Sequence, residues 1–141
     1  MTRIVRDTNG RKYVIEKQSS QSTRVRDPQT GERTHLPNDE LEPVEGTSSL
    51  DVALAGLPKP VVSLVSGVPN RRALGLLADI DTRGPTSVRT LIEETTFCES
   101  DLHGTLTVLC ATDLLREVKV AGERGYETTD TAHAALELLR E

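Results

Sequence analysis

The sequence predicts an α+β fold in which a small antiparallel β-sheet precedes a helical domain that carries a β-hairpin of its own. Three observations support this prediction. Residues 1–42 alternate apolar and polar side chains in short runs that are separated by turn sequences. From residue 70 onward, apolar residues recur at helical spacing in four segments. A further pair of alternating runs lies between the third and the fourth of these segments.

Two hairpins are predicted to form the N-terminal sheet, residues 1–42. In the first, Asn9-Gly10 separates two alternating runs and favours the positive φ angles of a type I′ turn, so that Ile4 with Val14, or their neighbours, can cover one face. In the second, the sequence DPQTGE separates residues 23–27 from residues 33–36. A sheet of two hairpins is only marginally stable alone, so we expect it to dock on another part of the protein.

Residues 43–69 are predicted to form a connector with two short helices. Ser48 or Ser49 can cap a helix over LDVALAG, which Gly56 and Pro58 would end. Pro60 suits the first turn of a second helix over PVVSLVSGV. Both helices are apolar and nearly uncharged, so we expect them to pack against the next domain or against a second subunit.

Three helices are predicted at the start of the third part, residues 70–141. Asn70 caps the first, and Gly84-Pro85 ends it. The second begins at Thr86 or Ser87, and Ser100 caps the third. The predicted inward positions are Ala73, Leu76, Leu77 and Ile80, then Val88, Leu91 and Ile92, then Leu102, Leu106, Leu109 and Cys110.

A β-hairpin and a closing helix follow. The run LLREVKV alternates as a strand, AGERG turns, and YETT returns as its partner. Asp130 begins the last helix, with an apolar stripe of Ala132, Ala135, Leu136 and Leu139. Helix, helix, helix, two-stranded hairpin, helix is the order of a winged helix-turn-helix domain.

The segments that carry this order resemble those of winged-helix regulators of the ArsR/MarR type. They are GPTSVRTLIEET, SDLHGTLTVLCATDLL and GYETTDTAHAALELL, and they span about half of the chain. With its basic N-terminal sheet, the whole arrangement resembles a group of uncharacterised proteins from halophilic archaea. The resemblance implies a regulator that binds double-stranded DNA, and we expect a homodimer because such regulators meet paired half-sites. It indicates no operator, no effector ligand and no direction of regulation.

The resemblance also implies which residues face DNA. On the recognition helix they are Ser100, Asp101, His103, Gly104, Thr105 and Thr107. The threonine hydroxyls could bond to bases or phosphates, and the Ser100 hydroxyl lies at a helix N-terminus, which attracts phosphate. Arg124 is predicted in the wing turn, where a cation can enter the minor groove.

Three further arginines, Arg71, Arg72 and Arg89, lie near helix starts and could hold the DNA backbone. Taken one at a time, each of these cations is more often a solvated or ion-paired surface residue.

Charge is unevenly distributed. Residues 1–36 carry eight Lys/Arg against four Asp/Glu, and the remainder carries nine against eighteen. Thirteen of the seventeen basic residues are arginine, which together with an acidic surface suits a high-salt cytoplasm. Glu99 and Asp101, at the tip of the recognition helix, would repel phosphates. Either high salt makes this repulsion weak, or the N-terminal sheet binds DNA or RNA while the winged helix binds a protein partner.

Other activities have less support. The sequence has no Walker loop, GxSxG or HExxH motif, so we expect neither an enzyme nor a cofactor. A metal site of Cys98 and His103 shared between subunits is an alternative to two partly buried side chains, and Cys110 is expected in the core.

No apolar run is long enough to span a membrane and no signal peptide is expected, so we predict a cytoplasmic protein. The second candidate function is a protein-interaction or assembly module.

Overall fold

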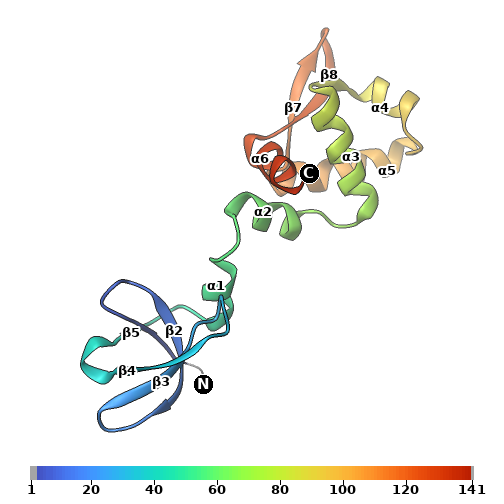
Figure 1. Cartoon of the computed structure of the whole chain (residues 1–141). Helices are drawn as coiled ribbons and strands as arrows, with labels where there is room; N and C mark the ends of the chain where they lie inside the picture. The colour runs from blue at the N-terminus through green and yellow to red at the C-terminus, as the bar shows by residue number, and fades with distance from the viewer. Residues whose placement is uncertain (1–2, 141) are drawn as a thin grey trace. The chain divides into compact units, whose positions relative to one another are not determined.

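The computed structural model describes residues 3–140 and consists of two compact units, with Leu57 at the end of the first and Pro58 at the start of the second. The first unit is an antiparallel sheet with one short helix, and the second combines five helices with a small sheet (Figure 1). The predicted α+β fold, with an N-terminal antiparallel sheet followed by a winged helix-turn-helix domain, is confirmed.

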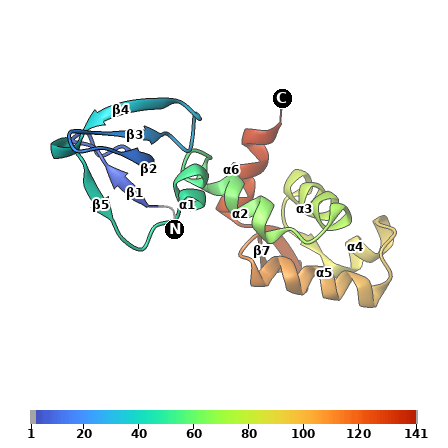
Figure 2. The ribbon, with the colours of Figure 1, turned by 90° about the horizontal axis from the view of Figure 1, so that it is seen from below.

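The N-terminal sheet has five strands in the order β4-β3-β2-β1-β5, all antiparallel to their neighbours (Figure 2). Its elements are β1 (Ile4–Arg6), β2 (Lys12–Gln18), β3 (Ser22–Arg26), β4 (Arg33–Pro37), a 3₁₀ turn (Asn38–Glu40), β5 (Glu42–Val44) and α1 (Ser49–Leu54). Both predicted hairpins form, and Ile4 pairs with Val14, so that of the two predicted possibilities these residues themselves, and not their neighbours, share a face. Strand β5 was not predicted; it pairs with β1 and extends the sheet beyond residue 42.

The first hairpin has a different turn from the one predicted. Only Gly10 has a positive φ, of 84°, whereas Asn9 keeps a negative one, so a three-residue loop replaces the type I′ turn. Asp7 explains the difference, because its carboxylate accepts hydrogen bonds from the backbone N–H groups of Asn9 and Arg11, both at 2.9 Å. This side chain starts the turn two residues before Asn9.

The N-terminal sheet is buried on both faces near its centre. On one face, Val52 of α1 packs on Ile4 and Val14. On the opposite face, Val25 and Thr23 are buried, and the Thr23 hydroxyl donates to Asn38 Oδ1 at 2.5 Å. Helix α1 therefore belongs to the N-terminal unit and supplies the docking element that the two hairpins were expected to need.

The C-terminal unit begins with α2 (Lys59–Gly67) and then follows the predicted order. Its other elements are α3 (Arg71–Arg83), β6 (Thr86–Ser87), α4 (Val88–Glu94), α5 (Glu99–Ala111), β7 (Leu115–Val120), β8 (Glu123–Thr128) and α6 (Asp130–Leu139). The short strand β6 pairs with β8, giving a three-stranded sheet β6-β8-β7. Gly125 permits this pairing, because a Cβ there would lie 2.6 Å from the Thr86 carbonyl oxygen.

The predicted connector is divided between the two units. Its first helix, α1, packs on the N-terminal sheet, and its second, α2, packs on α6. Leu64 is fully buried, and Gly67 lies so close to the turn after α5 that a Cβ would stand 2.9 Å from Thr112 Cβ. Each of the two helices therefore has an apolar face that its own unit buries.

The core of the C-terminal unit consists mostly of leucine. Leu76, Leu91, Leu106, Leu109, Leu115 and Leu136 are all buried, as the sequence predicts. Two predicted inward positions are wrong. Ile92 is exposed because Leu91 takes the inward position of the two-turn helix α4, and Leu139 is exposed because it lies at the end of α6, beyond Leu136.

The wing, formed by β7 and β8, turns through two residues with positive φ angles, Ala121 at 51° and Gly122 at 81°. This is the backbone of a type I′ turn, in which alanine is strained and asparagine is favoured. We expect Ala121→Asn to raise the free energy of unfolding by about 0.5–1 kcal/mol, measured by urea denaturation. The same exchange at Ala134, inside α6, should lower it by about 0.5 kcal/mol. A loss of stability at both positions would contradict the turn.

Within residues 3–140, no helix combines the length and the apolar character that crossing a membrane requires.

Candidate nucleic-acid interface

Helix α5 presents the predicted face to solvent. Leu102, Leu106 and Leu109 point into the core, which leaves the residues between them outside. Ser100, Asp101, Gly104 and Thr107 are exposed, and His103 and Thr105 are partly buried. No lysine or arginine lies on α5, so this face is polar, small in its side chains and without a positive charge of its own.

The start of α5 differs from the prediction. The helix begins at Glu99 with Cys98 in the capping position, so Ser100 is not the cap. Glu99 and Asp101 lie in the first turn, where carboxylates interact favourably with the positive end of the helix dipole. The place at which a helix N-terminus would attract phosphate is therefore already flanked by two negative charges, and this weakens the predicted role of the Ser100 hydroxyl.

The two threonines of α5 differ in their hydrogen bonds. The Thr107 hydroxyl donates to the His103 carbonyl oxygen, one turn back, at 2.8 Å. Its proton is engaged, and only its lone pairs remain to accept a bond from a base. Thr105 forms no such bond among the described residues, so its hydroxyl can both donate and accept.

A shallow depression joins α5 to the start of α3. It has a volume of about 380 Å³ and is lined by Pro69, Asn70, Arg72, Phe97, Ser100, Asp101, Gly104, Thr105 and Val108. The Arg72 guanidinium lies 4.2 Å from the centre of the Phe97 ring, in a cation–π contact that fixes it beside the depression. Arg72 is thus next to Ser100, Gly104 and Thr105 in space, and Arg71 precedes it at the first position of α3.

The arginines of the wing are held by acidic and phenolic partners. Arg124 lies on β8 rather than in the turn, which corrects the prediction. Its guanidinium donates to the Tyr126 hydroxyl at 2.8 Å and lies 3.1 Å from the Glu117 carboxylate. Arg89, at the second position of α4, pairs with Glu123 at 2.9 Å.

Sequence reasoning missed Lys119, which pairs in register with Arg124 across the wing. The alternation in LREVKV carries the signal, because Val118 and Val120 are partly buried while Lys119 is exposed. The wing therefore presents two cations side by side.

A second polar cluster, at Asp81, lies away from α5. The Asp81 carboxylate accepts hydrogen bonds from Thr128 Oγ1 at 2.9 Å, His133 Nδ1 at 2.8 Å and Arg140 Nη1 at 2.8 Å, so it ties α3 to β8 and α6. Burial by itself would raise the pKa of Asp81, but these hydrogen bonds outweigh it and lower the pKa below its ordinary value. The same contact raises the pKa of His133, first through the hydrogen bond and then through the charge of Asp81.

Ligand atoms of Asp81, His133 and Glu137 lie within 4.8 Å of one another, the spacing of a candidate metal site. Arg140 Nη1, however, is 2.8 Å from Asp81 and 3.0 Å from Glu137. A guanidinium that bridges two of the three ligands makes this cluster an ion-pair network. Cys98 and His103 join no such group among the described residues. Cys110 packs against the core, and burial raises the pKa of its thiol, as befits the expected core residue.

Comparison with known proteins places the chain in a family. The model of a family described as "Family of unknown function (DUF7346)" matches residues 2–140, almost the whole chain. No curated protein and no solved structure matches significantly. The chain belongs to the family of unknown function DUF7346.

Proposed function

We propose that this protein is a DNA-binding transcriptional regulator whose helix α5 enters the major groove. The observation that carries the proposal is the outer face of α5, where Ser100, Gly104, Thr105 and Thr107 have short polar side chains or none. A helix with this face can approach base edges closely, and hydroxyl groups can both donate to and accept from them. The wing and α4 flank α5 as in winged helices that bind DNA.

Phosphate contacts then come from the flanks of α5. Arg72 lines the depression, Arg71 precedes it at the start of α3, and Lys119 lies on the wing. To bind phosphate, Arg89 would leave Glu123 and Arg124 would leave Glu117. Exposed ion pairs of this kind contribute only about 0–1 kcal/mol each to stability, so breaking them costs little. The free thiols Cys98 and Cys110 suit a reducing cytoplasm. If its salt concentration is high, screening makes the repulsion between the acidic surface and DNA weak.

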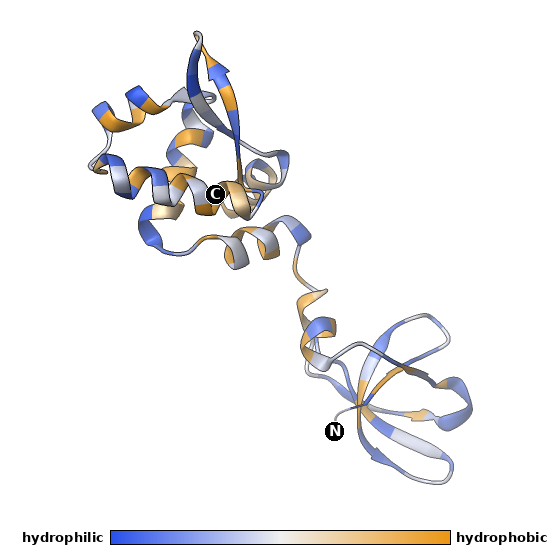
Figure 3. Ribbon diagram, turned by 180° about the vertical axis from the view of Figure 1, so that it is seen from behind, coloured by the Kyte–Doolittle hydropathy of each residue, from blue (hydrophilic) through white to orange (hydrophobic). Residues whose placement is uncertain are grey.

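We also propose a homodimer. The ribbon of α2 carries hydrophobic residues (Figure 3), and the structure exposes Val65 of α2 by 71% and Leu138 of α6 by 58%. These two helices pack on each other, so their exposed residues belong to one part of the C-terminal unit. A two-fold dimer would bury such residues and present two α5 helices to paired half-sites. Light scattering in high salt should give twice the chain mass, and a monomer mass at micromolar protein would exclude the dimer.

Binding to duplex DNA in high potassium chloride tests the proposal. Fluorescence anisotropy should show that a genomic probe selected by the protein binds more tightly than a random one. Thr105→Ala should reduce the ratio of the two affinities, selected probe over random probe, by up to about tenfold, because base contacts determine the preference. Arg71→Gln with Arg72→Gln should weaken binding to both probes alike. If the full-length chain binds no DNA in low or high salt, the proposal fails.

A protein-interaction module is the second candidate. It is favoured by Glu99 and Asp101 at the start of α5 and by Val108, which is partly exposed on the same face. On this reading, substitutions on α5 would leave nucleic-acid binding unchanged.

A further inference from the structure

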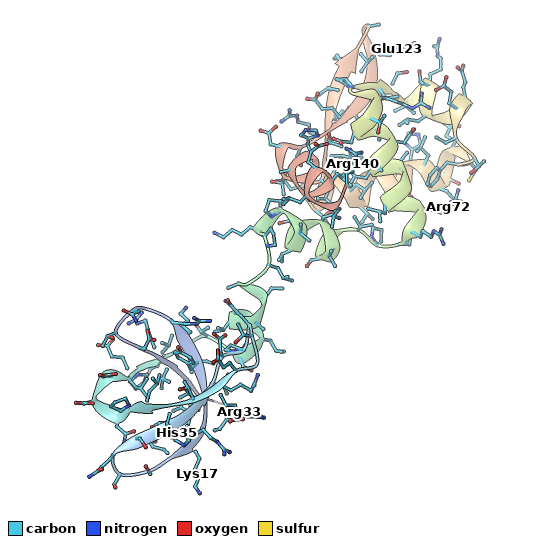
Figure 4. The ribbon with its side chains drawn as sticks, in the orientation of Figure 1. Lys17, Arg33, His35, Arg72, Glu123 and Arg140 are labelled. Atoms are coloured by element: carbon cyan, nitrogen blue, oxygen red, sulfur yellow. The ribbon has the colours of Figure 1, made fainter. Side chains whose placement is uncertain are left out.

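We infer that strands β2, β3 and β4 bind the phosphodiester backbone of nucleic acid through the part of one sheet face that α1 leaves exposed. This surface, called here the basic face, consists of Lys17, Arg24, Arg26, Arg33 and His35, and Figure 4 shows three of them on the N-terminal sheet. The inference goes beyond the proposed function, because it does not require α5 to enter a groove.

Strand pairing places these residues on one face. Lys17 pairs with Arg24, and Arg24 pairs in turn with His35, so the three form a row across the sheet. Arg26 and Arg33 pair in the neighbouring row. Along β3 the two rows are two residues apart, about 7 Å, and neighbouring strands are about 4.8 Å apart.

A bulge in β2 adds to this arrangement. The register shifts between Ile15 and Lys17, so that Glu16 and Lys17 together face Arg24. The bulge brings Lys17 onto the same face as Arg24, and Glu16 with it. Glu16 contacts Arg33 Nε at 2.9 Å and Arg24 Nε at 3.4 Å.

The basic face has few counter-charges. Glu16 is its one carboxylate and serves two arginines, while Lys17 and Arg26 have no ion pair among residues 3–140. The other acidic residues of the unit lie in the hairpin loops, the 3₁₀ turn, β5 and the segment around α1: Asp7, Asp27, Glu32, Asp39, Glu40, Glu42, Glu45 and Asp51. The unit is therefore nearly neutral as a whole but strongly polarised.

Like charges that face each other across strands destabilise a sheet. The rows of the basic face set cation against cation, and an external polyanion would relieve this repulsion. Helix α1 covers the other part of the same face, over Ile4 and Val14, so the cations remain on the open part.

Nucleic acid fits this surface better than a protein or a membrane does. The open part carries no large apolar side chain: its one aromatic ring is the His35 imidazole, and Pro37 lies at its edge. Protein interfaces, in contrast, have apolar or aromatic centres, and membrane-surface segments insert apolar residues. An arginine guanidinium can donate two hydrogen bonds to the oxygens of one phosphate, in a bidentate contact. Backbone contacts without base contacts should make binding independent of sequence and dependent on salt.

The test removes three charges from the basic face in the full-length chain. The variant Lys17→Gln, Arg24→Gln, Arg33→Gln is compared with Arg3→Gln, Arg6→Gln, Lys59→Gln, which loses the same charge elsewhere. Affinity for a random 20-base-pair DNA duplex is measured by anisotropy at several potassium chloride concentrations. We expect at least tenfold weaker binding for the first variant and a salt slope lower by about 2–3, since each phosphate contact contributes about 0.9. The control should stay within about twofold, with the slope of the unmodified protein. Circular dichroism checks that both variants keep the fold.

Each other outcome is decisive. Equal losses of DNA affinity in the two variants would assign the effect to net charge and overturn the inference. Binding of the unmodified protein to anionic phosphatidylserine vesicles, without binding to the duplex, would also overturn it. Measurements with an RNA duplex of the same sequence show whether the phosphodiester comes from DNA or RNA. Weaker binding of the first variant to either duplex, or to both, supports the inference that the basic face binds phosphodiester. Unchanged binding by the first variant overturns the inference but leaves the proposed function standing, because Thr105→Ala tests sequence preference separately.

Discussion

Asp81→Ala is expected to lower the free energy of unfolding by about 2–4 kcal/mol. The Asp81 side chain is only 2% exposed and accepts three hydrogen bonds, from the Thr128 hydroxyl, the His133 ring and the Arg140 guanidinium. Its loss disconnects α3 from β8 and α6 at one point and leaves the Thr128 hydroxyl without its acceptor. Urea denaturation followed by far-ultraviolet circular dichroism measures the effect, because the C-terminal unit holds most of the helix.

Asp79 provides a matched control on the same helix. It lies two residues away, is 38% exposed and pairs with Arg83 at a spacing of four residues. Surface pairs of this kind contribute about 0.3–0.5 kcal/mol, so Asp79→Ala should have a small effect. Similar losses for the two variants would show that the Asp81 network has no special role in stability.

The same network predicts how stability depends on pH. The pKa of His133 is raised in the folded protein, so its contribution is complete below the ordinary histidine pKa, near 6.5, and is lost as pH rises through the folded value. The pKa of Asp81 is lowered, so its contribution is complete above about 3.9 and is lost as pH falls through the folded value. His133→Gln should therefore lie closest to the unmodified protein in stability at alkaline pH. A difference that grows from pH 6 to pH 9 would contradict the assignment.

Local signals in the sequence predicted most of the fold. Asn70 caps α3, Gly84 follows it with a φ of 82°, and the leucines at helical spacing are buried, because caps, breakers and periodicity act within a few residues. The pairing of β5 with β1 was missed because it joins segments almost forty residues apart, and three residues carry too little pattern. The first turn was wrong for a related reason, since the Asp7 carboxylate outweighed the preference of Asn9-Gly10.

The candidate interface shows the same limit. The exposed face of α5 follows from the spacing of Leu102, Leu106 and Leu109, and all six predicted residues lie on it or at its border. The state of the arginines could not be predicted, because their partners come from other elements. Arg124 is bound across the wing by Glu117, and Arg72 rests on the Phe97 ring. Strand register alone, once known, assembles the basic face from residues that the sequence scatters over three strands.

Gly104→Leu is expected to weaken binding to a selected DNA probe by at least tenfold while making the protein more stable. Gly104 is exposed on the outer face of α5, and a Cβ there meets no heavy atom within 4 Å, so the substitution fits the fold. Glycine inside a helix is about 0.8–1 kcal/mol less favourable than alanine, so a leucine should add about 0.5–1 kcal/mol of stability.

The same change at Gly75 isolates the functional effect. Gly75 is also exposed, lies inside α3 and has open space at its Cβ, so Gly75→Leu should give the same gain in stability. It lies outside the face of α5, and binding should stay within about twofold of the unmodified protein. The contrast follows from the proposed function, because a branched side chain at Gly104 would stand between α5 and the base edges, and tenfold corresponds to about 1.4 kcal/mol. Equal affinity of the two variants for the selected probe would mean that α5 does not enter the groove, even if the basic face still holds the DNA backbone.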